Sequence, residues 1–207
     1  MATPTHAAAA AELAGRDPVM RGLVEAVGPP DLRRPQRSAF EALTRSICFQ
    51  QLSGKAAATI YGRFEVAVGG EVTPEAVLAT PAEDLRRAGL SAAKTLSILD
   101  LAEKVLDGTV PIGRLGRLDD DELVARLVVV RGIGRWTAEM FLIFQLRRLD
   151  VWPVDDLGVR KGYARAYGLE EAPAPRRLAE LGDSFRPYRS VAAWYCWRAI
   201  ELEQLPG

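Results

Sequence analysis

The feature that most constrains the fold is a glycine hairpin, GIGRWTA, at residues 132–138. An apolar run, LVVV, precedes it and a second helix-like segment follows, so it predicts two helices joined by a tight turn on Gly132 and Gly134. Glycine tolerates positive φ and lets another group approach the backbone closely. N–H groups of such a turn, at the start of a helix opening at Arg135, attract an anion. The hairpin therefore predicts an anion site, for which a DNA phosphate is a natural occupant.

A second segment, VWPVDDLG at residues 151–158, places Asp155 and Asp156 just after a proline, where a further helix can start. A carboxylate held near a bound anion can act on the group that the anion carries. The alternative is an N-cap pair that satisfies free N–H groups at the helix start. Each motif alone is weak, and their order and spacing together are far more specific.

Helix start and stop patterns run along nearly the whole chain. Ser38 and Glu41 form a capping box, and the acidic run that begins at Asp119 suits the positive end of the first hairpin helix. Thr80 followed by Pro81 is a cap with a proline at the first helical position. Gly54 interrupts the first of these helices, and further helices are expected over residues 57–64, 91–106, 156–167, 176–181 and 188–202. With no convincing strand and no internal repeat, the predicted fold class is all-α.

Composition sets the outer bounds. The chain has 207 residues, of which 48% are hydrophobic, so it is globular, with one sizeable core or two small lobes. Cys48 and Cys196 match no disulfide framework, zinc site or four-cysteine cluster, and buried positions are expected for both. No apolar run reaches the roughly 18 residues of a membrane span. Without a signal-peptide pattern, a cytoplasmic location is expected.

The net charge is zero, with 27 basic and 27 acidic residues. A protein that grips phosphates mainly through Lys and Arg usually has a basic excess, so the balance argues mildly against nucleic acid. Backbone N–H groups and helix termini bind phosphate without adding formal charge, which weakens the objection. Basic residues do cluster locally, either as a binding surface or as solvated helix faces, and these are Arg131, Arg135, Arg147, Arg148, Arg160, Lys161 and Arg165.

Over residues 36–202 the chain resembles the helix–hairpin–helix base-excision DNA glycosylases, most closely the 3-methyladenine DNA glycosylase II (AlkA-like) branch. The resemblance rests on residues 40–53 (FEALTRSICFQQLS), 89–95 (GLSAAKT), 132–138 (GIGRWTA), 153–157 (PVDDL) and 186–190 (RPYRS), together with Trp197. It implies two helical lobes with the active site in the cleft between them.

The same resemblance implies how the chain is divided. Residues 1–36 are expected to form an N-terminal segment packed on the C-terminal lobe. Residues 37–150 are expected to carry the helix–hairpin–helix, and residues 151–207 to form the C-terminal lobe with the catalytic aspartate. Only about 35 residues precede the matching region, where longer bacterial relatives have a β-rich domain.

Site residues follow from the family pattern position by position. Asp156 matches the catalytic aspartate, and Leu52 matches the wedge that enters the duplex, with Gln51 beside it. The resemblance also implies a base pocket, a DNA-backbone contact and a monovalent cation (Na⁺ or K⁺) on hairpin carbonyls. The base-pocket residues are Trp136, Trp197, Met140 and Asp155. The backbone-contact residues are Gly132, Gly134, Arg135 and Thr137, and the carbonyls are those of Val128, Val130 and Gly132. Taken alone, Leu52 and Trp197 could instead be core residues.

These residues indicate a monofunctional glycosylase that excises alkylated purines such as 3-methyladenine and 7-methylguanine. Bifunctional relatives have a lysine directly after the hairpin, and Trp136 stands there, so strand cleavage by that route is not expected. Met140 replaces an aromatic residue common in the pocket. Glycosylases for oxidised or deaminated bases and a non-catalytic damaged-DNA-binding module are the alternatives. The expected partner is double-stranded DNA with alkylated bases, with no membrane, obligate protein partner or required cofactor.

Overall fold

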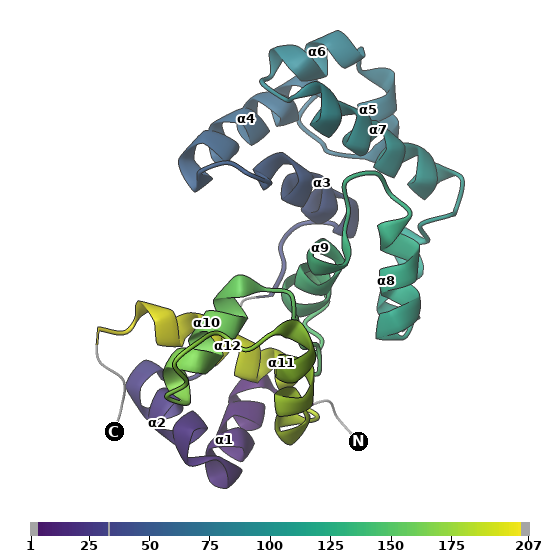
Figure 1. The fold of residues 1–207 in the computed structure, drawn as a ribbon. Coiled ribbons are helices and arrows are strands. Elements are labelled where there is room, and N and C mark those ends of the chain that lie inside the picture. Colours follow the sequence, from purple (N-terminus) through teal and green to yellow (C-terminus); the bar gives the residue numbers. More distant parts are fainter. Residues whose placement is uncertain (1–3, 33, 204–207) are drawn as a thin grey trace. The chain divides into compact units, whose positions relative to one another are not determined.

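The computed structural model describes residues 4–32 and 34–203, which form helices and connecting turns with no β-strand in either range. The all-α prediction is confirmed. The chain divides into two compact units (Figure 1): unit 1 is residues 1–34 and 142–207, and unit 2 is residues 35–141. The expected boundary at residue 150 lies inside unit 1. Within the described ranges, the helices fall short of the length and apolar character that a membrane span requires.

Unit 1 is built from two N-terminal helices and the C-terminal part of the chain. Its helices are α1 (His6–Arg16), α2 (Pro18–Val27), α10 (Leu157–Ala166), α11 (Pro175–Leu181), η3 (Gly182–Phe185) and α12 (Arg189–Glu201). Sequence patterns had not located α1 and α2. Asp17 followed by Pro18 does mark the start of α2, because Asp17 Oδ1 accepts a hydrogen bond from Met20 N at 2.9 Å.

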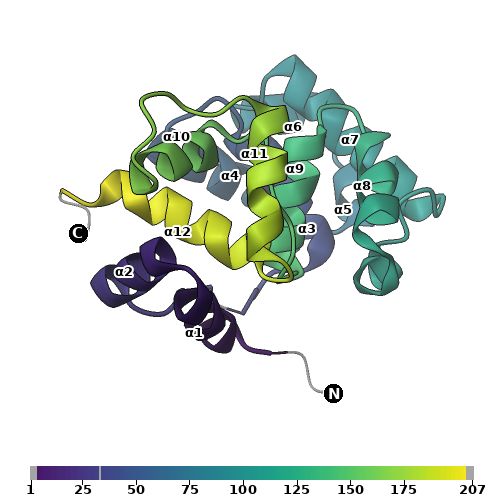
Figure 2. The ribbon, with the colours of Figure 1, turned by 60° about the horizontal axis from the view of Figure 1, so that its bottom comes forward.

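Helices α1 and α2 lie against α12 in unit 1 (Figure 2). Two tyrosines tie the N-terminal helices to the rest of the unit: Tyr188, at the start of α12, donates Oη to Glu12 Oε2, and Tyr167, at the end of α10, donates Oη to Asp17 Oδ2, both at 2.8 Å. Burial, together with the hydrogen bond to Asp17, raises the pKa of Tyr167. The N-terminal helices are therefore an integral part of this unit.

Helices α10 and α12 of unit 1 are in close backbone contact. A Cβ added at Gly162 would lie 1.8 Å from the carbonyl oxygen of Cys196, so only glycine allows α12 to pack this near. Around this contact lies an apolar core that includes Leu13, Met20, Trp152, Val159, Phe185 and Tyr195.

Unit 2 contains all the remaining helices except η2, which is described below. They are α3 (Ala39–Phe49), α4 (Gly54–Ala67), α5 (Pro74–Ala79), α6 (Ala82–Arg87), α7 (Ala92–Leu106), η1 (Ile112–Arg117), α8 (Asp120–Val128) and α9 (Arg135–Met140). The expected N-cap Ser38 is in place, and Asp119, expected only as the first acid of the run, is the N-cap of α8. Ser38 Oγ accepts from Glu41 N at 3.1 Å, and Asp119 Oδ1 accepts from Glu122 N at 2.7 Å.

One expected cap is wrong. Thr80 ends α5 instead of starting α6, because its hydroxyl donates back to the carbonyl of Ala76 at 2.8 Å, and Pro81 is the N-cap of α6. A threonine hydroxyl can bond backward to a carbonyl as readily as it accepts a forward N–H. The local pattern did not distinguish the two.

Helices α8 and α9 form the predicted helix–turn–helix (Figure 1). Helix α9 does not continue as a regular α-helix. It passes into a π-helical turn, η2 (Phe141–Gln145), and the division between the two units falls inside this turn. π-helical turns are rare in proteins overall, and those that occur are often found at functional sites.

Both cysteines are buried, as predicted: Cys48 on α3 and Cys196 on α12. Burial raises the pKa of the Cys48 thiol to about 12, so this thiol stays protonated and behaves as a small apolar group.

The Gly162 contact predicts a selective loss of stability. Gly162→Ala should lower the free energy of unfolding by about 1–3 kcal/mol, because a methyl group would overlap the backbone of α12. Gly15→Ala in α1 is the matched control: nothing lies within 4 Å of its Cβ position. It should leave stability unchanged or raise it by about 0.5–1 kcal/mol. Urea unfolding followed by circular dichroism measures both, and equal effects would show that the α10–α12 contact is not tight.

Candidate active site

Asp156 is the N-cap residue of α10 and is largely buried, with 9% of its surface exposed. Its Oδ1 accepts a hydrogen bond from the backbone N–H of Val159 at 2.7 Å. The capping role considered from the sequence is thus present in the structure. The same oxygen accepts a second hydrogen bond, from Nε1 of Trp197 at 2.9 Å. The carboxylate is therefore held in one orientation by a helix terminus and an indole.

Trp197 is only half-buried and stacks on Phe144, with ring centroids 5.6 Å apart and an angle of 25° between the planes. Its approach to Asp156 depends on Gly158, where an added Cβ would lie 2.8 Å from Trp197 Cδ1 and 3.0 Å from Asp156 Oδ1. A side chain at residue 158 would push the indole away from the carboxylate. Trp197 thus has a polar contact that the sequence did not predict.

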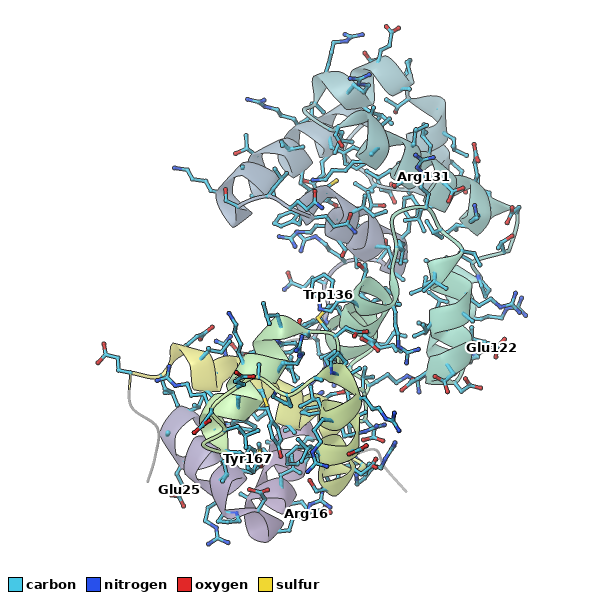
Figure 3. All side chains as sticks on the ribbon, in the orientation of Figure 1. Arg16, Glu25, Glu122, Arg131, Trp136 and Tyr167 are labelled. Carbon is cyan, nitrogen blue, oxygen red and sulfur yellow. The ribbon has the colours of Figure 1, made fainter. Side chains whose placement is uncertain are left out.

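The other expected pocket residues differ in exposure and unit. Asp155 lies beside Asp156 in unit 1 and is exposed. Trp136 and Met140 belong to α9 of unit 2; Met140 is half-buried, while Trp136, labelled in Figure 3, is 45% exposed. Nearly half of this side chain is therefore accessible to solvent.

The turn between α8 and α9 is fastened to α7. Arg131, which lies in this turn (Figure 3), donates its backbone N–H to Asp100 Oδ2 at 2.7 Å. Burial opposes ionisation of Asp100, yet its pKa is lowered, because the Lys104 ammonium and the Arg131 N–H both bond its carboxylate. Gly132 has φ of 76°, and a Cβ there would lie 2.6 Å from Ser97 Oγ. This glycine is needed both for its backbone conformation and for its close contact with α7.

Gly134 differs from Gly132, and the expectation that it too needs positive φ is wrong. Its φ is −92°, and nothing lies within 4 Å of its Cβ position. Gly134 is the N-cap of α9, so the open space around it leaves room for another molecule to approach the helix start. Arg135 is exposed and pairs with Glu139 at 2.9 Å, whereas the Thr137 side chain is buried. A phosphate contact at Thr137 would therefore come from its backbone N–H.

The expected wedge lies in the turn between α3 and α4. Gln51 has φ of 56°, which is uncommon for a residue other than glycine, and Leu52 is 40% exposed. The carbonyls of Cys48 and Gln50 accept hydrogen bonds from Lys94 Nζ on α7, at 2.8 and 2.7 Å. The wedge turn is therefore braced by the same helix as the hairpin. Leu52 does not lie in the core.

Several clustered basic residues make bonds within their own unit. Arg147 Nη2 lies 3.0 Å from His6 Nδ1, and Arg160 Nε donates to the carbonyl of Pro173 at 2.8 Å. Arg165 Nη2 donates to the carbonyl of Leu202. These contacts hold arginines to the protein, in keeping with a structural role for part of the basic cluster.

Two of the three hairpin carbonyls expected to bind a cation already accept hydrogen bonds. The Val130 carbonyl accepts from Ile133 N at 3.1 Å, and the Gly132 carbonyl accepts from Gln50 Nε2 at 2.9 Å. A carbonyl oxygen has two lone pairs, so one hydrogen bond leaves room for a second interaction. The carbonyls of Val128, Val130 and Gly132 therefore remain chemically suitable for Na⁺ or K⁺.

Three residues of this region were missed by the sequence analysis, namely Phe144, Gln50 and Lys94. The sequence analysis gives Phe144 no place in the base pocket. Lys94 belongs to a segment that carries the family resemblance, and its spacing from Ser97 and Asp100 puts all three on one helical face. These three polar residues on one helical face indicated that this helix supports neighbouring turns. Nothing local indicated the contact of Gln50 with Gly132, which lies 82 residues away.

The profile of the HhH-GPD superfamily, described as base excision DNA repair proteins, matches residues 44–187. The chain belongs to this superfamily, and the resemblance inferred from its sequence is confirmed.

Within this superfamily, the chain is similar to proteins named 3-methyladenine DNA glycosylases. The chain is 37% identical over 195 residues to DNA-3-methyladenine glycosylase 1 of Schizosaccharomyces pombe, covering 92% of this chain and 86% of that protein. A solved structure of the 3-methyladenine DNA glycosylase from that yeast, in complex with abasic DNA, matches with a TM-score of 0.83 and 37% identity, covering 94% and 97% of the two chains. A DNA-3-methyladenine glycosidase from Bacillus halodurans matches with the same TM-score and identity, over 90% and 86%.

The two hairpin glycines predict opposite outcomes. Gly132→Ala should lower the free energy of unfolding by about 1 kcal/mol or more, because alanine disfavours positive φ and its methyl group would collide with Ser97. Gly134→Ala should leave stability almost unchanged, since its φ is negative and its surroundings are open. Thermal unfolding of the two variants side by side tests this. A larger loss for Gly134→Ala would contradict the turn geometry.

Proposed function

We propose that this protein is a monofunctional DNA glycosylase that hydrolyses the N-glycosidic bond of alkylated purines, of the 3-methyladenine and 7-methylguanine type, in double-stranded DNA. The observation that carries the proposal is the Asp156 carboxylate, oriented by Trp197 and the start of α10. It occurs in a member of a base-excision repair superfamily whose relatives at 37% identity are named DNA-3-methyladenine glycosylases.

Access to the damaged base requires the nucleotide to leave the helix, which costs a few kcal/mol. An apolar side chain that fills the vacated stack offsets part of this cost. Leu52 suits this task because it is exposed on a turn that Lys94 braces. We assign to Gln51, beside it, a contact with the bases that remain paired.

The chemistry takes place at the sugar. An alkylated purine is cationic and leaves readily, so the bond between C1′ and the base nitrogen breaks with the electron pair going to the base. The sugar becomes oxocarbenium-like, and the fixed Asp156 carboxylate stabilises its positive charge. A water molecule then adds to C1′, and its proton passes to a base such as this carboxylate. The products are the free base and an abasic site, and the reaction needs no cofactor.

Selectivity for cationic bases comes from aromatic faces. An aromatic ring attracts a cation by about 0.5–2 kcal/mol. Trp136 in unit 2 and the Phe144–Trp197 stack in unit 1 offer such faces. Met140, which replaces a common aromatic, provides a polarisable thioether instead.

The DNA backbone is held mainly by N–H groups of the hairpin and of the start of α9, around Gly132, Gly134 and Arg135. A monovalent cation on the carbonyls of Val128, Val130 and Gly132 would add positive charge beside the phosphate. Trp136 occupies the position of the lysine of bifunctional relatives, so no Schiff base forms there. The protein works on chromosomal DNA, in the cytoplasm if the cell is bacterial.

Base release from methylated DNA tests this function. DNA treated with a methylating agent should yield free 3-methyladenine and 7-methylguanine, identified by mass, and the strand should stay intact at the abasic site. Borohydride should trap no covalent protein–DNA adduct. Release of only oxidised or deaminated bases would change the lesion class. Binding without any release would leave a damaged-DNA-binding module, and a trapped adduct would overturn the monofunctional mechanism.

Asp156→Asn removes the charge and keeps the shape of the side chain. Asparagine Oδ1 can still accept from Val159 and Trp197, so the fold should persist. The single-turnover excision rate should fall by about 10²-fold or more, the size of effect seen when one stabilising group of a transition state is lost. Affinity for abasic DNA should stay constant or rise, because a negative charge has gone. Asp155→Asn should reduce the rate less, and a fully active Asp156→Asn would remove the catalytic assignment.

Trp197 contributes a hydrogen-bond donor and an aromatic ring, and two substitutions separate the effects of these two groups. Trp197→Phe keeps a ring but loses the hydrogen bond to Asp156, so excision of 3-methyladenine and of neutral hypoxanthine should both slow by about tenfold. Trp197→Ala also loses the face that stacks on Phe144, so 3-methyladenine should suffer several-fold more than hypoxanthine. Single-turnover rates on the two substrates decide this. Wild-type rates for Trp197→Phe would exclude orientation of the carboxylate as its role.

A further inference from the structure

Gln50 is held from two sides within unit 2. It is the C-cap residue of α3, and its carbonyl accepts the Lys94 ammonium at 2.7 Å. Its side chain extends the other way and donates Nε2 to the carbonyl of Gly132 at 2.9 Å. One residue therefore joins the turn that carries Leu52 to the glycine turn of the hairpin.

The two turns that Gln50 joins are also fixed by contacts that do not involve its side chain. The hairpin is fastened to α7 through Asp100 and through the contact of Gly132 with Ser97. The wedge turn is fastened to α7 through Lys94, which also bonds the carbonyl of Cys48. The Gln50–Gly132 bond lies at the surface of the unit, so its loss removes a link between the turns without removing the anchors of either.

The hairpin turn and the wedge turn, which Gln50 joins, have distinct roles in the proposed function. Gly132 belongs to the turn that grips the phosphate backbone. Gln51, at φ of 56°, and Leu52 directly follow Gln50, so the side chain of Leu52 lies two residues from the bond. A shift of Gln50 relative to Gly132 would change where Leu52 meets the duplex once the hairpin has bound the backbone.

We propose that Gln50 is a positioning residue that fixes the wedge turn to the hairpin, so that backbone binding sets the point at which Leu52 enters the duplex. The inference rests on the proposed function, since it assigns a task to Leu52 and to the hairpin. Gln50 acts through Leu52 and does not touch the reacting atoms.

Gln50→Met tests this, because methionine keeps the length of the side chain and lacks the N–H donor. Affinity for an intact duplex should change less than twofold, since the hairpin keeps its anchors. Affinity for a duplex with a tetrahydrofuran abasic analogue should fall by about 3- to 10-fold, as expected for the loss of one hydrogen bond. Fluorescence of 2-aminopurine placed beside the abasic analogue, which reports unstacking by the wedge, should fall in parallel.

A double-mutant cycle shows whether the effect passes through the wedge. In the Leu52→Ala background, Gln50→Met should cause no further loss of preference for abasic DNA, because the positioned group is absent. Gln36→Met makes the same chemical change at an exposed residue before α3 and should behave like wild type. Thermal midpoints within a few degrees of wild type confirm that each variant is folded.

Three results would overturn the inference. The first is an equal loss of affinity of Gln50→Met for intact and abasic duplexes. The second is that the effects of Gln50→Met and Leu52→Ala on affinity add independently, and the third is a wild-type protein that does not prefer abasic DNA. Base release is measured separately. A wild-type protein that prefers abasic DNA but releases no alkylated base would refute the proposed function and still leave the coupling of Gln50 to Leu52 measurable.

Discussion

The contact of α10 with α12 at Gly162 determines the geometry of the candidate catalytic carboxylate. Trp197 follows Cys196, whose carbonyl oxygen packs where a side chain on residue 162 would be. The backbone contact therefore sets where the indole N–H lies, and this N–H reaches Asp156 Oδ1 at 2.9 Å. Gly158, one helical turn before Gly162, leaves space for the ring. Gly158 and Gly162 together thus allow the helix packing that orients the Asp156 carboxylate.

Helix α7 has the corresponding task in unit 2. Its side chains at residues 94, 97 and 100 recur at helical spacing and share a face. Lys94 bonds the end of α3, Ser97 packs against Gly132, and Asp100 accepts the N–H of Arg131. A single rigid helix thereby holds both the exposed Leu52 turn and the hairpin. Functional elements supported by one helix keep their relative position better than elements supported by separate loops.

The zero net charge of the chain is compatible with the proposed grip on DNA through backbone N–H groups. Part of its arginine content is committed to internal bonds, as with Arg147 beside His6 and Arg160 on the carbonyl of Pro173. Backbone N–H groups at a glycine turn and a helix start bind phosphate without contributing formal charge. Composition alone underestimates the affinity of such a protein for DNA, because it counts side-chain charges only.

The sequence by itself determined the family, the hairpin and most of the helices after residue 38, although it did not locate α1 and α2. Caps such as Ser38 and Asp119 act within three residues, and the glycine turn is equally local, so a short segment contains the physical cause of each element. It could not distinguish Thr80 as the end of one helix from the start of the next, because a hydroxyl bonds in either direction. Tertiary structure alone decided the partners of Trp197 and Gln50, which lie 41 and 82 residues away in the chain. Such pairings depend on how the helices pack in three dimensions. The periodicity of residues along the chain does not specify which distant residues come into contact.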